Sequence, residues 1–169
     1  MTRRLLFALL LAGPLLVAAA PEPTGPQAEL PKEELVILTH DGQRHVFHVE
    51  MALKTDQQIT GLMFRPHVPA DGGMLFDWGL PRESQMWMRN TISSLDMLFI
   101  NPDGTIRGIA ERTVPQSLAV IDSHGPVRAT LELAAGTAER LDIRVGDTVQ
   151  QRIFGNAPAP SAPALPKSP

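Results

Sequence analysis

Turn-forming residues divide the chain between Glu33 and Phe154 into short apolar runs. Asp41-Gly42 and Asp103-Gly104 each follow such a run, and an Asp-Gly pair at this place predicts a hairpin because tight turns need residues with positive φ. No long amphipathic helix separates the runs. Many short strands joined by turns are typical of all-β domains. The sequence therefore predicts a mainly β fold: a single antiparallel β-sandwich or barrel (jelly-roll-like) of eight or nine short strands with one or two short helices.

The expected strands are runs of β-branched, aromatic and other apolar residues bounded by turn signals. They cover residues 34–39, 44–53, 74–78, 85–90, 95–100, 105–111, 119–121, 127–133 and 148–154.

One helix of about two turns is expected after residue 54, since Thr55-Asp-Gln-Gln58 fits a capping box of the Thr-x-x-Gln type. Ile59, Leu62 and Met63 follow at helical spacing and are expected to face the core. A second, shorter helical turn is expected over residues 137–141.

The N-terminus has the features of a secretory signal. Met1-Thr-Arg-Arg4 is basic, and Leu5 to Ala20 carries no charge. This uncharged stretch is shorter than the roughly 20 residues that a membrane-spanning helix needs, so a cleaved signal is favoured over a retained anchor. Val17-Ala18-Ala19 fits the cleavage site. We expect residues 1–19 to be removed and the protein to be periplasmic or secreted.

Composition separates the remaining chain into three parts. Residues 20–32 predict a Pro-rich linker, residues 33–154 the β domain, and residues 155–169 a disordered Pro/Ala-rich tail. The chain has no cysteine, which excludes disulfides and thiolate metal sites. Loss of Arg3 and Arg4 with the signal reduces 15 basic residues to 13 against 18 acidic ones, a net charge of −5. This balance argues against nucleic acid, and against a membrane after signal cleavage, as partners.

Several motifs resemble, in order, those of the uncharacterised bacterial and archaeal family catalogued as domain of unknown function 192. The matching pieces are Thr55, Gly61-Leu-Met-Phe-Arg65, Gly73-Met-Leu-Phe76, Trp87-Met-Arg-Asn-Thr91, Leu95-Asp96, Phe99-Ile100, Asp103-Gly104, Leu131-Glu-Leu-Ala-Ala-Gly136 and Gly146-Asp147. The resemblance implies a small, jelly-roll-like β domain that is often exported, and it implies no activity. Relatives usually have Phe and Lys where this chain has Met86 and Arg89.

A strand over residues 85–90 would place Trp87 and Arg89 on one face. A flat apolar ring beside a hydrogen-bonding cation suits sugars or anionic small molecules. The alternative is that Trp87 anchors the core and Arg89 covers it. On the same alternation, Met86 and Met88 share the other face, where two thioethers could bind copper(I) or simply fill the core.

Asp96 stands in an apolar run, so its carboxylate must be paired or hydrogen-bonded if it is buried. Arg65, Arg89 and the backbone amides between Thr91 and Ser94 are its candidate partners. A structural role, in which the acid ties a loop to a strand, competes with a role as general base, with Asn90 and Thr91 orienting a substrate.

The sequence lacks the common catalytic and metal-binding motifs. The five histidines are scattered, without a His-x-His pair, and neither a Gly-x-Ser-x-Gly elbow nor a phosphate-binding Gly-rich loop occurs. No cofactor and no metal site are expected.

The leading hypothesis is an exported, non-catalytic domain that binds a small polar or carbohydrate-like ligand or a cell-envelope component. Its expected ligand-binding residues are Arg65, Trp87, Arg89, Asn90, Thr91 and Asp96. The alternatives are a hydrolase with Asp96 as base, a copper(I)-binding protein that uses Met86 and Met88, and a structural or protein-interaction module.

Overall fold

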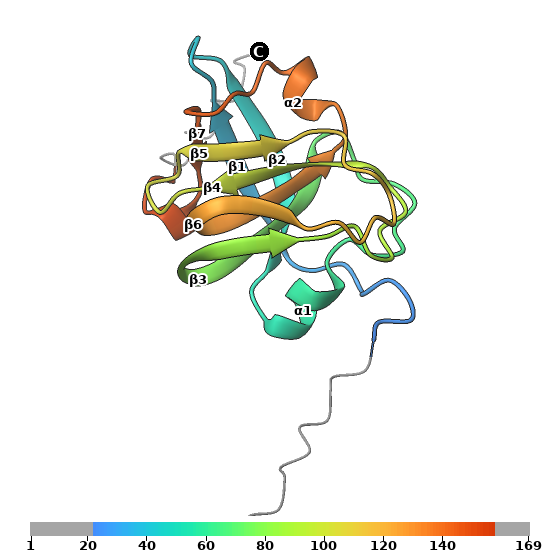
Figure 1. Cartoon of the computed structure of the whole chain (residues 1–169). Coiled ribbons are helices and arrows are strands. Elements are labelled where there is room, and N and C mark those ends of the chain that lie inside the picture. Colours follow the sequence, from blue (N-terminus) through green and yellow to red (C-terminus); the bar gives the residue numbers. More distant parts are fainter. Residues whose placement is uncertain (1–21, 158–169) are drawn as a thin grey trace, which may run out of the picture.

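In the computed structural model, which describes residues 22–157, seven strands form one mixed sheet in the order β5-β4-β6-β3-β2-β1-β7 (Figure 1). The strands are β1 (Lys32–Leu38), β2 (Arg44–Ala52), β3 (Gly72–Met86), β4 (Leu95–Ile100), β5 (Ile106–Ala110), β6 (Ile121–Ala134) and β7 (Thr148–Gln150). The prediction of a mainly β fold with two short helices is confirmed.

The two edges of the sheet meet, so that the sheet forms a nearly closed barrel. Thr105, just before β5, makes an isolated bridge with Thr148 of β7. The amide of Ile106 donates to the carbonyl of Asp147 at 2.8 Å, and the amide of Val149 donates to the carbonyl of Gly104 at the same distance. One sheet curved onto itself therefore replaces the two packed sheets of a sandwich.

The prediction of a wholly antiparallel sheet was wrong at one place. Strands β2 and β3 pair in parallel, with His48 opposite Gly72 and Ala52 opposite Phe76. A parallel pair needs a crossover rather than a tight turn, and residues 53–71, which include helix α1 (Thr55–Thr60), provide it.

The prediction of eight or nine strands was also wrong, because two pairs of expected strands are continuous. Residues 74–78 and 85–90 were expected as separate strands, but β3 spans both regions and ends at Met86. Its pairing with β6 is irregular between Asp77 and Arg82, and this irregularity accommodates the turn residues that suggested a break. In the same way β6, which begins at Ile121, includes the last residue of the expected strand 119–121 and all of the expected strand 127–133. The last expected strand is shorter, and a 3₁₀ helix, η1 (Arg152–Phe154), follows it.

Apolar side chains form two clusters on opposite faces of the sheet. The inner cluster fills the barrel and contains Leu35, Ile37, Phe47, Val49, Met51, Leu75, Leu98, Ile100, Ile106, Ala129, Leu131, Leu133, Ala138, Ile143 and Val149. The outer cluster contains Ala52, Leu62, Val68, Met74, Phe76, Met88, Leu95 and Met97. Strands β3, β4 and β6 are therefore covered on both faces.

Helix α1 has a capping box one residue away from the predicted one. The Gln57 side chain accepts a hydrogen bond from the backbone amide of Lys54 at 2.9 Å. Gln58 instead donates its amide to the carbonyl of Ala52 at 3.1 Å and to that of Asp77 at 2.7 Å. Gln58 therefore ties the helix to strands β2 and β3.

The helix ends at Thr60, before Gly61, which has a φ of 50°. Leu62 and Met63, just beyond it, are buried as predicted, whereas Ile59 is 47% exposed. In Figure 1, α1 lies at the opposite end of the barrel from the second helix, α2 (Thr137–Arg140).

The Pro-rich segment before β1 contacts the domain rather than standing free as a linker. Gln27 donates its amide to the carbonyls of Gln57 and Gly61 at 3.0 and 2.9 Å. Glu22 forms an ion pair with Arg89 at 3.1 Å. The predicted signal and most of the predicted tail lie outside the described residues. Within residues 22–157, no helix has the combination of length and apolar character that crossing a membrane requires.

Candidate pocket between helix α1 and the sheet

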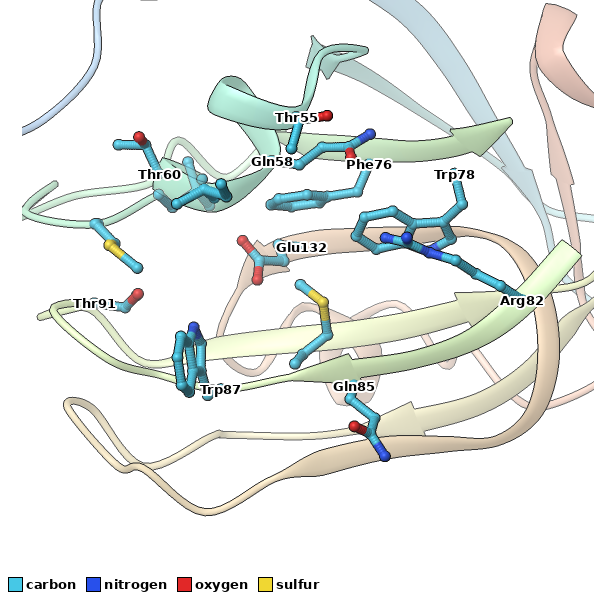
Figure 2. A pocket seen from close by; sticks show the side chains of 15 residues that line it. Thr55, Gln58, Thr60, Phe76, Trp78, Arg82, Gln85, Trp87, Thr91 and Glu132 are labelled. Atoms are coloured by element: carbon cyan, nitrogen blue, oxygen red, sulfur yellow. The ribbon is translucent and has the colours of Figure 1, made fainter. Parts of the chain in front are cut away.

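A pocket of about 310 Å³ lies between α1, the outer face of the sheet and the segment after β3 (Figure 2). Its walls come from parts of the chain that are far apart in the sequence. They are Thr55, Gln58, Ile59, Thr60, Gly61, Leu62 and Met63 at the helix, Phe76, Trp78, Arg82, Gln85 and Met86 of β3, Trp87 and Thr91 after it, and Glu132 of β6. The parallel crossover therefore builds one side of the pocket.

Glu132 provides the acidic group of the pocket. Its side chain points into the middle of the space in Figure 2, and the residue is only 4% exposed. Its neighbours across the sheet are Met74 on β3 and Met97 on β4. Among residues 22–157 no hydrogen bond or ion pair to its carboxyl group is present. Burial among apolar side chains raises the pKa of Glu132 to about 8.

Three aromatic rings surround this acid. Phe76 and Trp78 lie 5.8 Å apart between ring centroids, and the Trp78 indole donates to the Thr130 hydroxyl at 3.3 Å. Trp87 lies across the pocket and is 47% exposed. An ionisable group with a strongly shifted pKa inside a pocket marks a candidate functional site.

Each tryptophan carries a guanidinium group on its ring. The Arg82 guanidinium carbon lies 4.2 Å from the ring centroid of Trp78. The corresponding distance from Arg89 to Trp87 is 5.4 Å. Both distances fall in the range of cation–π contacts.

Most polar side chains in the pocket walls already donate hydrogen bonds within the protein. The Gln58 amide binds two carbonyls, and the Gln85 amide donates to Asp122 at 3.2 Å. The hydroxyls of Thr60 and Thr91 donate to backbone carbonyls at 3.2 and 3.3 Å. Within residues 22–157 the Glu132 carboxyl, the Arg82 guanidinium and the Trp87 indole N–H make no hydrogen bond, so the pocket offers a ligand an acid as well as donors.

Two of the six residues expected to bind a ligand, Trp87 and Thr91, line this pocket. Arg89 lies beside Trp87 but pairs with Glu22. The expected alternation over residues 85–90 was wrong, because β3 ends at Met86 and a turn follows. Asn90 has a φ of 55° in that turn.

Arg65 lies away from the pocket and forms a buried ion pair with Glu50. Its side chain is 14% exposed and that of Glu50 is 6% exposed. One nitrogen–oxygen distance of the pair is 3.0 Å, and Glu50 also accepts from the amide of Leu30 at 2.8 Å. Arg65 therefore joins the crossover segment to β2.

Asp96 is completely buried and hydrogen-bonded, as its position in an apolar run requires, but the expected partners were wrong. Its carboxylate accepts from the backbone amides of Arg112 at 2.9 Å, Gly136 at 3.1 Å and Ala138 at 2.9 Å. Asp96 therefore holds the segment after β5 and the start of α2 against β4. It is not among the residues that line the pocket.

The two methionines considered for copper(I) have different surroundings. Met86 is partly buried and lines the pocket. Met88 is completely buried in the outer cluster, and its sulfur accepts a hydrogen bond from the Thr113 hydroxyl at 3.2 Å. Within residues 22–157, no three His, Asp or Glu side chains converge on a point where they could hold a metal ion.

Sequence reasoning missed Glu132, Phe76, Trp78 and Arg82 as pocket residues. The available signal was the single acid inside the run from Leu131 to Gly136, one of the pieces shared with the family. Period-two alternation places the side chain of Glu132 on the other face of the strand from those of Leu131 and Leu133. In most antiparallel sheets that face is exposed to solvent. Here α1 and the segment after β3 cover that face.

The family model described as "Uncharacterized ACR" (DUF192) matches residues 36–151, from the middle of β1 to just after β7. No curated protein matches the chain.

Two solved structures are similar over most of their length. A protein described as a "putative transcription regulator" from Sinorhizobium meliloti has 46% sequence identity and a TM-score of 0.73, covering 75% of this chain and 98% of that one. A protein of unknown function from Novosphingobium aromaticivorans has 35% identity and a TM-score of 0.71, covering 79% and 94%.

Proposed function

We propose that this chain, which belongs to the DUF192 family, binds a small polar ligand in the pocket between α1 and the sheet. The observation that carries the proposal is the Glu132 carboxyl, which is buried and unpaired within the described residues and points into a space with aromatic walls. An unpaired buried carboxyl destabilises the fold. A ligand that pairs with it would regain part of that free energy.

The pocket has properties common to small-molecule sites. It is concave, and its walls combine aromatic and aliphatic side chains with a similar share of polar ones. Trp78 and Trp87 offer flat surfaces of the kind that bind the apolar faces of small ligands. Its volume of about 310 Å³ is at the lower end for such sites, which favours a ligand of monosaccharide size or smaller.

The proposal includes export of the protein to the periplasm or out of the cell. Export is supported by the basic start and the uncharged run over residues 5–20. In the periplasm or outside the cell, the domain would meet small solutes and cell-envelope components. We do not propose the regulator function named for the Sinorhizobium meliloti protein, because a net charge of −5 disfavours contact with nucleic acid.

The three alternatives stay predictions that no particular contact favours. For the hydrolase, Asp96 would have to act as base, although its oxygens accept from three backbone amides. For copper(I), Met88 would have to give up its contact with Thr113. The interaction module has no identified surface.

Thermal shift of residues 20–169 against sugars, small amines and small acids tests the proposal. At least one class should raise the melting temperature of the wild type, and Trp87→Ala should reduce that shift. Val145→Ala is the control, because Val145 is 62% exposed and does not line the pocket. If all three classes fail to stabilise the wild type, the proposal is wrong.

A further inference from the structure

We infer that the ligand of this pocket is a small organic cation whose ammonium group pairs with Glu132. This inference rests on the proposed function and specifies the chemical class of the ligand. It follows from three properties of the pocket: its charges, its aromatic faces and its hydrogen-bonding groups.

The charges of the pocket leave Glu132 uncompensated. Arg82 is the one other charged residue in the described walls. It stacks on Trp78 and makes no ion pair with Glu132. Arg89, which lies beside Trp87, forms an ion pair with Glu22. A cation that enters the pocket would make the direct ion pair with Glu132 that neither arginine makes.

The aromatic faces favour the same class. Arg82 and Arg89 already place their guanidinium groups on Trp78 and Trp87, so both rings accept cations in the free protein. Phe76 adds a third ring beside the acid (Figure 2). An acid surrounded by aromatic rings is the arrangement that recognises ammonium and methylated ammonium groups.

Most neutral hydrogen-bonding side chains of the pocket already use their donors, which disfavours sugars. A sugar hydroxyl both donates and accepts, and a carboxylate only accepts. Gln58, Gln85, Thr60 and Thr91 already use their donors within the protein. An ammonium group donates only, and it therefore matches the ionised carboxylate of Glu132, while the Arg82 guanidinium lies on the ring of Trp78.

Binding of a cation should release a proton. The raised pKa of Glu132 keeps its carboxyl group mostly protonated near pH 7, whereas the bound cation needs the carboxylate. Affinity for a cation that does not itself titrate should rise about tenfold from pH 6 to 7 and about fivefold from pH 7 to 8, as the carboxylate fraction increases. A neutral ligand should lack this dependence.

The test is calorimetric titration of residues 20–169 with choline and with its uncharged isostere 3,3-dimethyl-1-butanol, at pH 6, 7 and 8. Glucose and N-acetylglucosamine form the second arm. We expect choline to bind at least tenfold more tightly than the isostere and to gain affinity with pH. Glu132→Gln should lose at least tenfold in choline affinity and lose the pH dependence.

Glu139→Gln is the matched control, since Glu139 is exposed, pairs with Arg112 and lies outside the pocket. Equal binding of choline and the isostere, or unchanged choline binding by Glu132→Gln, would overturn the cation assignment. If only the sugars bind, the assignment is also wrong, but the proposed function stands. Absence of binding in both arms would contradict both proposals.

Discussion

The Asp96 carboxylate accepts a hydrogen bond of 2.9 Å from the backbone amide of Ala138, 42 residues away in the sequence. Its other oxygen accepts from Arg112 and Gly136. One buried side chain thus fixes two loops to β4. This geometry gives Asp96 a structural role and makes it distinct from Glu132, which has a carboxyl group without such partners.

Asp96→Asn should lower the free energy of unfolding by about 2–3 kcal/mol, because the new amide group would face a backbone donor and leave it unsatisfied in the interior. Urea unfolding measures the change. Asp142→Asn is the control, since Asp142 is 59% exposed in its pair with Arg144 and should contribute less than about 1 kcal/mol. A fully stable Asp96→Asn protein that loses ligand binding would instead support a role for Asp96 in the site.

Glu132 should make the protein less stable as pH rises. In the unfolded chain its pKa is near 4.5, and in the folded protein it is raised to about 8. Between these values the folded state holds a proton that the unfolded state has released, so the free energy of unfolding falls as pH increases. Glu132→Gln removes this effect. The variant should gain about 3 kcal/mol relative to wild type between pH 5 and pH 8.

Urea unfolding at pH 5, 6, 7 and 8 gives this difference directly. The exposed Glu139→Gln variant should follow the wild-type curve. Parallel curves for wild type and Glu132→Gln would mean that Glu132 titrates normally in the folded protein.

Gly73 permits the close approach of β3 and β6 next to Glu132. Its φ is 156°, and a Cβ atom there would collide with the carbonyl oxygen of Glu132. Gly73→Ala should therefore cost more than about 3 kcal/mol, since backbone must move to admit the methyl group. Thermal unfolding monitors the loss.

Gly42→Ala is the control that separates the steric clash of a new methyl group from the backbone strain of a positive φ. Gly42 has a φ of 83°, but no heavy atom outside its immediate chain neighbours lies within 4 Å of the position that a methyl group would take. The substitution should cost only about 1 kcal/mol. Equal losses for the two variants would show that the β3–β6 contact imposes no steric limit.

Arg65→Met should destabilise the domain by about 3–5 kcal/mol, because Glu50 would be left as a buried charge without its partner. The double variant with Glu50→Gln should recover much of this loss. Arg152→Met removes a pair with Glu33 in which the Arg side chain is 55% exposed, and it should cost less than about 1 kcal/mol. Chemical denaturation compares the three variants. If Arg65→Met is as mild as Arg152→Met, the buried pair does not stabilise the crossover.

Local patterns in the sequence predicted much of the inner face of the barrel. Period-two alternation places Phe47, Val49, Met51 and Leu53 on one face of a strand, and the first three are buried, whereas Leu53 is 49% exposed. Burial chemistry also predicted that Asp96 needs hydrogen bonds. Its actual partners could not be predicted, because they come from loops that only the closed barrel brings together.

The candidate site depends on the same long-range arrangement. Alternation assigns Glu132 to the face opposite Leu131, and in an ordinary sandwich that face meets solvent. The parallel pairing of β2 and β3 carries α1 across this face and turns an exposed acid into a buried one. No local pattern in the sequence predicts the parallel crossover or the end of β3 at Met86.

Methionine methyl NMR tests the central claim, ligand binding over Glu132, most directly. Met63 and Met86 line the pocket, whereas Met51 lies in the inner cluster of the barrel. With methyl-labelled methionine, titration of choline into the wild type should shift the resonances of Met63 and Met86 and leave that of Met51 in place. Saturating choline and sugars that leave Met63 and Met86 unmoved would contradict the account.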